Sequence, residues 1–413
     1  MTPRRRSPRS LAAVALPVVL VLTVAVAAAE TAQSDACAGP RWVSTWTTAH
    51  QDAGDRFVDQ TVRSIVTPTV DGSQVRITLS NRFGDRPVTF DDVHVATSLG
   101  GASVNPETIR PVSFGGQRSV TIRPGRVAVS DPAPLEVRRG DDLAVSYHVD
   151  GGVPLDRHHE AMQTSYMTPP GSGRHGAAVV GSDFTVETTT WYALASVDVL
   201  SPRPVGAVAV LGDSITEGLG STPDAGQRWP DHLARRTSGR TAVLNAGIGG
   251  NHASRDFVLV HEGKRTDFGP GAVDRLRPDV LARAGVTDLV VFIGINDVFT
   301  QISDDVVADV TRSYRQIARR ADRAGLRVIG ATLTPASLDP EREADRRAIN
   351  EWIRSAEVFD AVVDFERVVA DPSDPTRLRP RYDADRVHLT DAGYAALGRA
   401  FDESLLQGTG CAA

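Results

Sequence analysis

The sequence contains very little lysine and few aromatic side chains. Lysine occurs once, at Lys264, so almost all of the 45 basic residues are arginines. The 51 acidic residues outnumber them and give a formal net charge of −6, which disfavours binding to the phosphates of nucleic acids. Aromatic residues make up 6% of the chain, which argues against a broad surface that adsorbs to lipid. We therefore expect a globular protein without a nucleic-acid partner.

Cysteine is also scarce, since only Cys37 and Cys411 are present, near opposite ends of the chain. In an oxidising compartment, such a pair is most simply joined in one disulfide bond, which we predict here. Two free thiols are the alternative. The bond would attach the N-terminal segment to the last predicted helix and would take no part in chemistry.

Several motifs of common enzyme classes are absent. The chain has no G-x-x-x-x-G-K-[ST] sequence, which excludes a P-loop. Residues 247–250 read Gly-Ile-Gly-Gly, which does not match the G-x-G-x-x-G of dinucleotide sites. Residues 158–160 read His-His-Glu, but adjacent histidines point to opposite sides of a strand, and no second ligand cluster is evident. We expect no metal and no cofactor.

The first 29 residues differ from the rest of the chain. Four arginines precede an apolar run from Leu11 to Ala28, and three alanines end it, which is the order of a secretory signal peptide over residues 1–29. The run of about 18 residues is marginal for spanning a membrane, and Pro17 interrupts it. We expect cleavage, secretion and no stable membrane insertion. An uncleaved anchor is the alternative, and the choice between Sec and twin-arginine export stays open.

Hydrophobic periodicity over residues 40–200 is typical of strands. Val75–Leu79 and Leu143–Val149 alternate apolar and polar residues, and further short runs are separated by Gly and Pro turns. Asp71-Gly72 lies between two such runs and predicts a hairpin. We expect a β-sandwich-like accessory domain over residues 40–200.

The period changes after Ser201-Pro202-Arg203-Pro204, a segment that cannot continue a strand ladder. Continuous apolar runs then alternate with helical patterns, which predicts a doubly wound parallel sheet over residues 205–408. The expected strands are Val205–Leu211, Ala242–Asn245, Asp288–Ile293, Arg327–Thr332 and Ala361–Phe365. The expected helices are Trp229–Thr237, Ala272–Ala284, Asp304–Ala324, Glu341–Ala356 and Asp391–Leu406.

Polar segments follow three of these strands and precede the last helix, and in such a sheet they would meet at the carboxyl edge. Ser214 lies at a predicted strand-to-helix turn, where it is either a helix cap or a nucleophile. A nucleophilic serine needs a base, for which His388 is the natural candidate, and Asp385 could hold the other ring nitrogen. The backbone N–H groups of Ser214 and Gly250 and the side-chain amide of Asn296 could bind an oxyanion.

Together these segments resemble the SGNH, or GDSL-type, hydrolase family. The resemblance covers about residues 205–407 and rests on four blocks, with isoleucine where the first block usually has leucine. The blocks are Gly212-Asp213-Ser214-Ile215, Asn245-x-Gly247-x-x-Gly250, Gly294-x-Asn296-Asp297 and Asp385-x-x-His388. An ordinary α/β-hydrolase is not expected, because residues 212–216 lack the second glycine of G-x-S-x-G.

The family resemblance implies a flavodoxin-like fold and metal-free ester hydrolysis. It implies Ser214 as nucleophile, His388 as base and Asp385 as its partner. It also implies an oxyanion hole formed by Ser214, Gly250 and Asn296, with Gly250 preferred over Gly249 on the family's spacing alone.

We therefore expect a secreted serine esterase that acts on small-molecule or polysaccharide esters, with short acyl or acetyl groups favoured. The alternative is a secreted carbohydrate-binding protein whose hydrolase half is inactive or secondary. Trp42, Trp46 and Trp191 could form a platform for sugars, although burial in a core is more common for tryptophan. His252 could line the pocket. A monomer is the default expectation, since no coiled coil or obvious interface is present.

Overall fold

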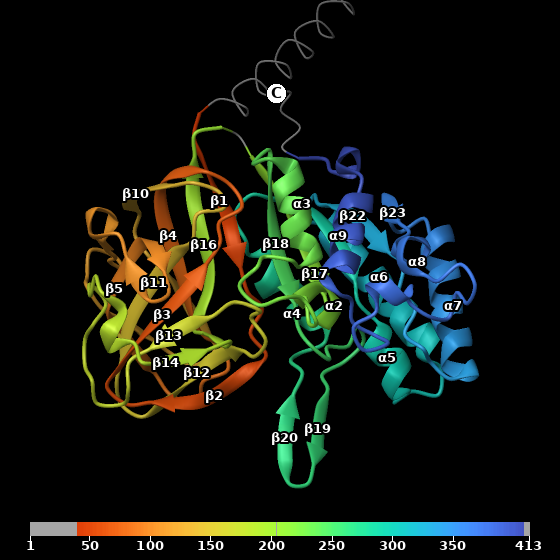
Figure 1. Ribbon diagram of the computed structural model, residues 1–413, viewed down its shortest axis with the longest axis horizontal. Coiled ribbons are helices and arrows are strands. Elements are labelled where there is room, and N and C mark those ends of the chain that lie inside the picture. Colours follow the sequence, from red (N-terminus) through yellow and green to blue (C-terminus); the bar gives the residue numbers. More distant parts are fainter. Residues whose placement is uncertain (1–38, 204, 409–413) are drawn as a thin grey trace, which may run out of the picture.

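The structure is a computed structural model that describes residues 39–203 and 205–408. Figure 1 shows an antiparallel β region lying beside an α/β region with a parallel sheet. This confirms the predicted fold class. The predicted signal peptide (residues 1–29) and both Cys37 and Cys411 lie outside the described residues.

The N-terminal half consists of three antiparallel sheets. The first contains β1 (Arg41–Thr47), β16 (Leu194–Ser201), β4 (Gly72–Asn81), β10 (Ala133–Val137) and β9 (Arg126–Val129). The second contains β14 (Val186–Thr188), β13 (Ser165–Met167), β3 (Gln60–Val66), β11 (Leu143–Val149) and β5 (Val88–Gly100), with the short strands β6 (Ser103–Val104), β7 (Arg110–Pro111) and β8 (Val120–Ile122). The third contains β15 (Trp191–Tyr192), β12 (Val153–His158) and β2 (Asp52–Phe57).

The prediction of a hairpin at Asp71-Gly72 is wrong. The chain turns there, but β3 pairs with β11 and β13, whereas β4 pairs with β16 and β10, so the turn connects two different sheets. A Cβ at Gly72 would come within 2.4 Å of Val199 Cβ. Gly72 is therefore required by close packing against β16, and the Asp-Gly pair does not specify a hairpin here.

The C-terminal half is built on a five-stranded parallel sheet in the order β18-β17-β21-β22-β23. The strands are β17 (Gly206–Gly212), β18 (Thr241–Gly247), β21 (Val286–Phe292), β22 (Arg327–Ala331) and β23 (Ala361–Val363). The chain reverses direction across the sheet after β18, so the switch point lies between β17 and β21. Ligand sites of such folds lie at this point, beyond the carboxyl ends of the strands.

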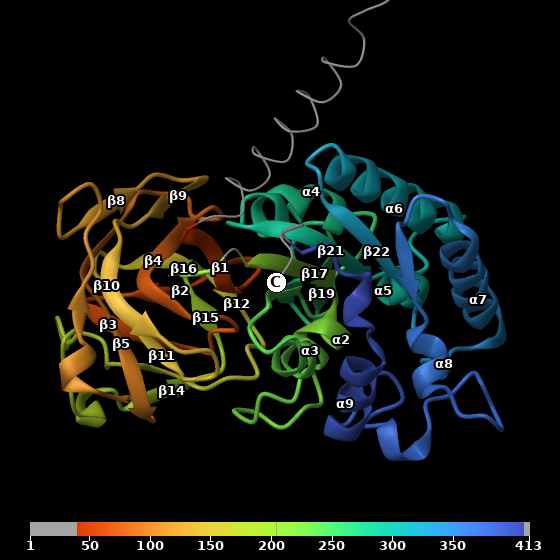
Figure 2. The ribbon, with the colours of Figure 1, turned by 90° about the horizontal axis from the view of Figure 1, so that it is seen from above.

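Helices cover both faces of the parallel sheet (Figure 2). The longer helices α6 (Val306–Asp322) and α7 (Pro340–Ser355) and the short α4 (Ala272–Leu276) lie on one face, and α3 (Trp229–Thr237), α8 (Phe365–Val369) and α9 (Asp391–Ala400) lie on the other. Alternate residues of β17 divide between the two cores, with Ala209 in one and Val210 in the other. This explains the continuous apolar run of β17.

Two predicted helices are shorter than expected. The helix predicted over residues 272–284 ends at Leu276 and continues as a π turn over Arg277–Leu281, where Pro278 has no backbone N–H to donate. The last helix ends at Ala400, and a separate 3-10 turn follows over Glu403–Leu405.

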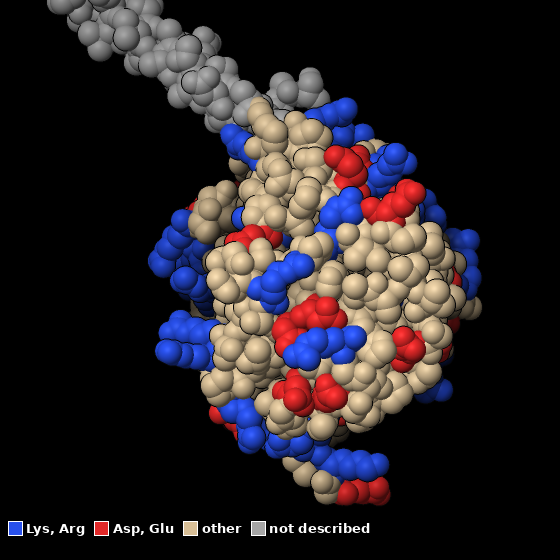
Figure 3. Space-filling model, turned by 90° about the vertical axis from the view of Figure 1, so that its left-hand side faces the viewer, with Lys and Arg blue, Asp and Glu red and all other residues tan. Residues whose placement is uncertain are grey.

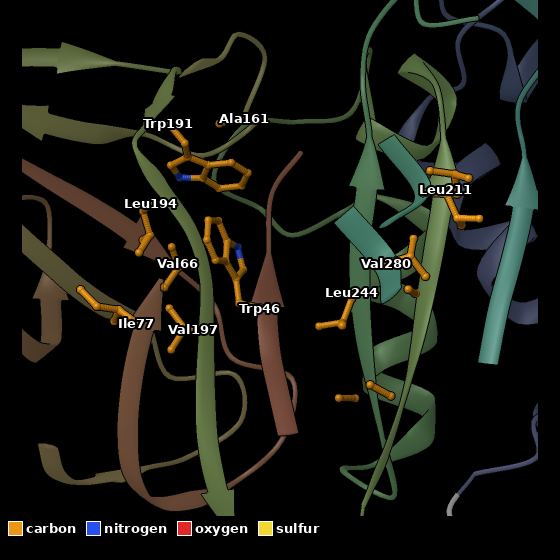
Figure 4. Close-up of a cluster of buried hydrophobic side chains, with 14 of the residues drawn as sticks. Trp46, Val66, Ile77, Ala161, Trp191, Leu194, Val197, Leu211, Leu244 and Val280 are labelled. Atoms are coloured by element: carbon orange, nitrogen blue, oxygen red, sulfur yellow. The ribbon is translucent and has the colours of Figure 1, made fainter. Parts of the chain in front are cut away.

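The two halves share a hydrophobic core. β1 lies beside β18 (Figure 1), and the backbone N–H of Ser44 donates to Ala284 O at 2.9 Å. Figure 4 shows Trp46 and Trp191 pointing toward each other, with Leu244 of β18 pointing toward β1. The two indole rings are 4.8 Å apart in an edge-to-face arrangement and at most 6% exposed. Both tryptophans are therefore core residues and offer no platform to a sugar.

The outer face of the β region carries acidic and basic side chains that are intermixed, with no large area of one sign (Figure 3). Within residues 39–203 and 205–408, none of the helices is both long and apolar enough to cross a membrane.

Candidate active site

Ser214 begins the short helix α2 (Ser214–Glu217) directly after β17. Asp213 caps this helix, because its side chain accepts a hydrogen bond from the backbone N–H of Ile215 at 3.0 Å. A Cβ at Gly212 would come within 2.1 Å of Thr216 Oγ1, so the turn requires glycine there. The strand therefore ends in a tight turn that places Ser214 at the carboxyl edge of the sheet.

Ser214, His388 and Asp385 form one hydrogen-bonded chain. Ser214 Oγ lies 2.8 Å from His388 Nε2, and His388 Nδ1 lies 2.7 Å from Asp385 Oδ2. These two hydrogen bonds orient His388 with Nδ1 toward the carboxylate, so that Nε2 can accept the serine proton. Asp385 and His388 lie 171 and 174 positions after Ser214 in sequence, and the fold alone brings them to it.

The loop that carries Asp385 and His388 is tightly hydrogen-bonded. Asp385 Oδ1 accepts from the backbone N–H groups of Val387 at 3.1 Å and His388 at 2.8 Å. Partial burial acts to raise the pKa of Asp385, but the hydrogen bonds from His388 and Val387 outweigh it and hold that pKa below its usual value. Asp385 therefore stays ionised and can stabilise a protonated His388.

Asn296 lies in α5 (Ile295–Thr300), which follows β21. Its Nδ2 donates to Asn251 O at 3.0 Å, so the amide lies beside the loop that contains Gly250. Gly250 has a φ of +70°, and a Cβ there would come within 2.1 Å of Phe268 Cδ1. Both geometric constraints require glycine at position 250. The bond from Asn296 thus joins α5 to the residue that follows Gly250.

Asp297, next to Asn296 in the third block, holds the neighbouring loop. Its carboxylate accepts from the backbone N–H of Ala253 at 2.8 Å and from the hydroxyl of Ser254 at 2.6 Å. His252 is 2% exposed, and its Nε2 lies 2.9 Å from Thr300 Oγ1. His252 is thus buried against α5.

Arg275 of α4 is a structural part of the site that the sequence did not indicate. It is fully buried and donates to Gly212 O at 2.6 Å, to Ala246 O at 2.7 Å and to Asn251 Oδ1 at 2.9 Å. These bonds tie the segment before Ser214 to the segment around Gly250. An arginine inside a helical pattern normally lies on the surface, so the sequence carried no signal for this role.

Two buried carboxyl groups lie next to Ser214 in sequence. Burial raises the pKa of Asp213 to about 7 and that of Glu217 to about 8. Glu217, at the end of α2, is 2% exposed, and its Oε1 lies 3.2 Å from His158 Nε2 in the β region. The contact between Glu217 and His158 crosses the boundary between the two halves. The sequence indicated neither of these two residues as part of the site.

His158 and His159 face opposite directions, as their adjacent positions on a strand predict. His158 points toward Glu217, whereas His159 Nε2 lies 3.2 Å from Asp52. Within the part of the chain that the structure describes, no group of three His, Cys, Asp or Glu side chains is placed to hold a metal ion.

An inter-domain cavity of about 320 Å³ lies away from the triad. Its lining comes from the β region and from the segment that leads into α3, and includes Thr69, Met162, Asp224 and Arg228. Neither Ser214 nor His388 lines it, so a molecule bound there would not contact the triad.

Several solved structures are similar to this chain, each over about half of its length. A GDSL-like lipase from Bacteroides thetaiotaomicron VPI-5482 is 20% identical, with 48% of this chain and 87% of that one covered and a TM-score of 0.36. A carbohydrate acetylesterase family member from Sinorhizobium meliloti is 18% identical, with 47% and 94% covered and a TM-score of 0.35. An aryl esterase from M. smegmatis is 14% identical, with 47% and 95% covered and a TM-score of 0.35.

No curated protein matches the sequence. The family model described as the GDSL-like Lipase/Acylhydrolase family matches residues 210–396, a range that includes Ser214, Asn296 and His388. This match confirms the resemblance drawn from the four blocks. The C-terminal half of the chain is therefore a GDSL-like lipase/acylhydrolase domain of the SGNH type, and the N-terminal region is an additional β domain.

Proposed function

We propose that this protein is a secreted serine esterase that hydrolyses carboxylic esters, with Ser214 as nucleophile. The observation that carries the proposal is the chain of hydrogen bonds from Ser214 through His388 to Asp385, at 2.8 and 2.7 Å. These hydrogen bonds lie at the carboxyl edge of the parallel sheet, and Asn296 of α5 bonds to Asn251, the residue after Gly250. The GDSL-like family match over residues 210–396 supports acyl-ester chemistry at this position.

The first half of the proposed reaction forms an acyl-enzyme. Ser214 Oγ attacks the ester carbonyl carbon while His388 Nε2 takes the hydroxyl proton, and Asp385 stabilises the resulting imidazolium. The negative charge on the carbonyl oxygen is bound by the N–H groups of Ser214 and Gly250 and by the amide of Asn296. The tetrahedral intermediate then expels the alcohol, which receives the proton from His388.

The second half repeats these steps with water in place of the alcohol. His388 takes a proton from water as the water oxygen attacks the acyl carbon, and Ser214 leaves with that proton. The carboxylic acid is released and the free enzyme is restored. No step requires a group other than those of the chain, the ester and water.

Restricted access to the nucleophile supports a preference for short acyl groups. Ser214 is only 5% exposed. The alternative of a carbohydrate-binding protein with an inactive hydrolase half loses support, since Trp46 and Trp191 are buried in the core and Trp42 is half-buried with Arg76 over its ring.

Hydrolysis of an acyl-chain series tests the activity. We expect the purified protein to hydrolyse p-nitrophenyl acetate and acetylated oligosaccharides faster than p-nitrophenyl palmitate. We expect Ser214→Ala to hydrolyse none of these three substrates. Faster turnover of palmitate would contradict the short-acyl preference. Equal rates for both proteins would contradict the enzymatic proposal itself.

We also propose export after removal of residues 1–29 and a bond between Cys37 and Cys411. N-terminal sequencing of the protein recovered from culture medium tests the first point. Non-reducing peptide mapping tests the second. A protein retained in cells with an intact N-terminus, or peptides that carry free thiols, would contradict them.

A further inference from the structure

A buried contact connects the β domain to the helix that begins with Ser214. Glu217 lies at the end of α2, and its Oε1 is 3.2 Å from His158 Nε2 of β12. Both side chains are at most 4% exposed. Neither carboxyl oxygen of Glu217 has a hydrogen-bond partner in good geometry within the described chain, so an ionised Glu217 would be left uncompensated. A carboxylate buried in this way would be strongly unfavourable.

The surroundings of His158 determine which ring nitrogen carries its proton. The ring stacks on Trp191, with centroids 5.6 Å apart, and its Nδ1 lies 2.9 Å from Ala49 O. A carbonyl oxygen only accepts, so Nδ1 must be the N–H donor. Burial lowers the pKa of His158 to about 4, so the ring is neutral near pH 7. Nε2, which faces Glu217, is therefore a hydrogen-bond acceptor.

An acceptor on His158 requires a donor on Glu217. A carboxyl group donates only when it is protonated, so the contact indicates an un-ionised acid. The raised pKa of Glu217, about 8, is consistent with this state at neutral pH.

The same side chain supports the loop of the oxyanion hole. A Cβ at Gly249 would come within 2.6 Å of Glu217 Oε2, so the carboxyl packs directly on that residue. The backbone N–H of Gly249 also approaches the carboxyl, in a looser contact. Gly249 immediately precedes Gly250, whose N–H is a proposed oxyanion donor.

We propose that the β domain positions the oxyanion hole through an un-ionised Glu217, which donates a hydrogen bond to His158 and packs against Gly249. This inference rests on the proposed role of Ser214 and Gly250 in ester hydrolysis. A neutral acid holds the loop without placing a negative charge beneath the site where an oxyanion forms. Glu217 and His158 are positioning residues and do not touch the substrate.

Other ionisable groups act on Glu217 from the surrounding elements. Glu160, after β12, and Asp213, before α2, raise the pKa of Glu217, whereas Arg275 of α4 lowers it. Asp213 itself has a pKa of about 7. A pH profile of the wild type alone would therefore mix these groups, and the contribution of Glu217 has to be isolated by an isosteric variant.

Glu217→Gln and Glu217→Met separate hydrogen bonding from packing. The glutamine amide can donate to His158 and its carbonyl can face Gly249, so this variant should retain most of the activity. Glu217→Met fills a similar volume without either contact, and we expect kcat to fall about 10- to 100-fold with a smaller change in KM, because the oxyanion donors are displaced. Equal losses in both variants would overturn the proposal.

Ionisation of Glu217 provides a second readout. We expect kcat of the wild type to fall above about pH 8 in a step that Glu217→Gln lacks. Superimposable alkaline profiles would overturn the proposed neutral state.

The contribution of the β domain is tested at His158. His158→Phe keeps an aromatic ring against Trp191 but removes the acceptor, and it should lower kcat as Glu217→Met does. Combining both changes should lower kcat little further, because each breaks the same contact. His159→Phe is the matched control and should leave kcat near the wild-type value, since His159 faces Asp52. Full additivity, or an equal effect at His159, would contradict the proposal.

An infrared difference spectrum tests the protonation state without catalysis. In a Ser214→Ala background at neutral pH, we expect the spectrum with Glu217 minus the spectrum with Glu217→Gln to contain a carboxylic-acid C=O band, since the contribution of Asp213 is common to both and cancels. Absence of that band would overturn the inference, even if Ser214 proves to be catalytic. If the band is present but the wild type hydrolyses no ester, Glu217 is un-ionised as proposed. Its role in positioning the oxyanion hole would then be refuted together with the proposed function.

Discussion

Arg275 donates from Nη2 to the carbonyl oxygen of Gly212 at 2.6 Å, across 63 positions of sequence. Gly212 is the last residue of β17, two positions before Ser214. The guanidinium therefore holds the backbone just before Ser214. Arg275 also lies 3.4 Å from Asp279, whose other oxygen lies 3.1 Å from Arg82 of the β domain. The turn that carries Ser214 is thus connected to the β domain through a second network of charged side chains.

Replacing Arg275 should destabilise the whole fold. Arg275→Met leaves three buried acceptors without their donor and removes the buried partner of Asp279, so we expect a loss of about 3–5 kcal/mol in the free energy of unfolding. Urea denaturation followed by circular dichroism measures it. Arg277→Met, at the exposed neighbouring position, is the control and should change that free energy by less than about 0.5 kcal/mol. Similar values for both variants would contradict the role assigned to Arg275.

Gly250→Ala should reduce turnover sharply. The added methyl group would meet Phe268 and would require a left-handed backbone, so the loop must shift and its N–H must move away from the oxyanion. We expect kcat for p-nitrophenyl acetate to fall about 100-fold or more.

A glycine in the β19–β20 hairpin (Val258–His261 and Lys264–Asp267) offers the matched control. Gly263 has a similar φ, +76°, but a Cβ there would meet no atom within 4 Å. Gly263→Ala should therefore add backbone strain of about 1 kcal/mol while kcat stays unchanged. A comparable fall in kcat for both variants would exclude a specific role for Gly250.

Asp385→Asn should impair catalysis more than it impairs folding. The amide can replace one oxygen of the carboxylate as a neighbour of His388, but it supplies no negative charge to stabilise the imidazolium and favours the wrong tautomer. We expect kcat to fall about 10³- to 10⁴-fold, with thermal unfolding close to that of the wild type. Retention of more than a tenth of the wild-type kcat would contradict the triad.

The stability of the protein should depend on the ionisation of Glu217. Its pKa is raised on folding, from 4.5 to about 8, so the folded state holds its proton more tightly than the unfolded state. The free energy of unfolding should therefore fall as pH rises through this window and level off above about pH 8. Glu217→Gln removes this slope and should be the more stable protein at pH 9, by up to about 5 kcal/mol. Parallel stability curves for the two proteins would contradict the raised pKa.

Sequence periodicity predicted the fold class because each half has a pattern of its own. Alternation in Val75–Leu79 reflects a strand whose apolar side chains face the core, whereas Leu143–Val149 alternates apolar and polar residues although all of them are buried. The continuous apolar run of β17 reflects packing on both faces of the parallel sheet. The hairpin at Asp71-Gly72 was wrong because local turn chemistry does not specify which strands pair. Pairing is decided by packing between sheets, as the contact of Gly72 with Val199 shows.

The four blocks indicated the candidate site because each ends a strand or precedes a helix that converges on one edge. Arg275, Glu217 and His158 could not be found in the same way. Their positions depend on partners far away in sequence, such as Gly212 for Arg275 and the β domain for Glu217. Residue type was misleading as well, since buried arginine and glutamate are rare.

The most direct test of the account is to locate a covalent adduct on the nucleophile. The wild type is treated with a fluorophosphonate, which reacts with activated serines, and the modified peptide is identified by mass spectrometry. We predict an adduct on Ser214 in the wild type and none in Ser214→Ala or in His388→Ala, because His388 activates the hydroxyl. A wild type that stays unmodified, an adduct on another residue, or undiminished labelling of Ser214 in His388→Ala would contradict the central claim.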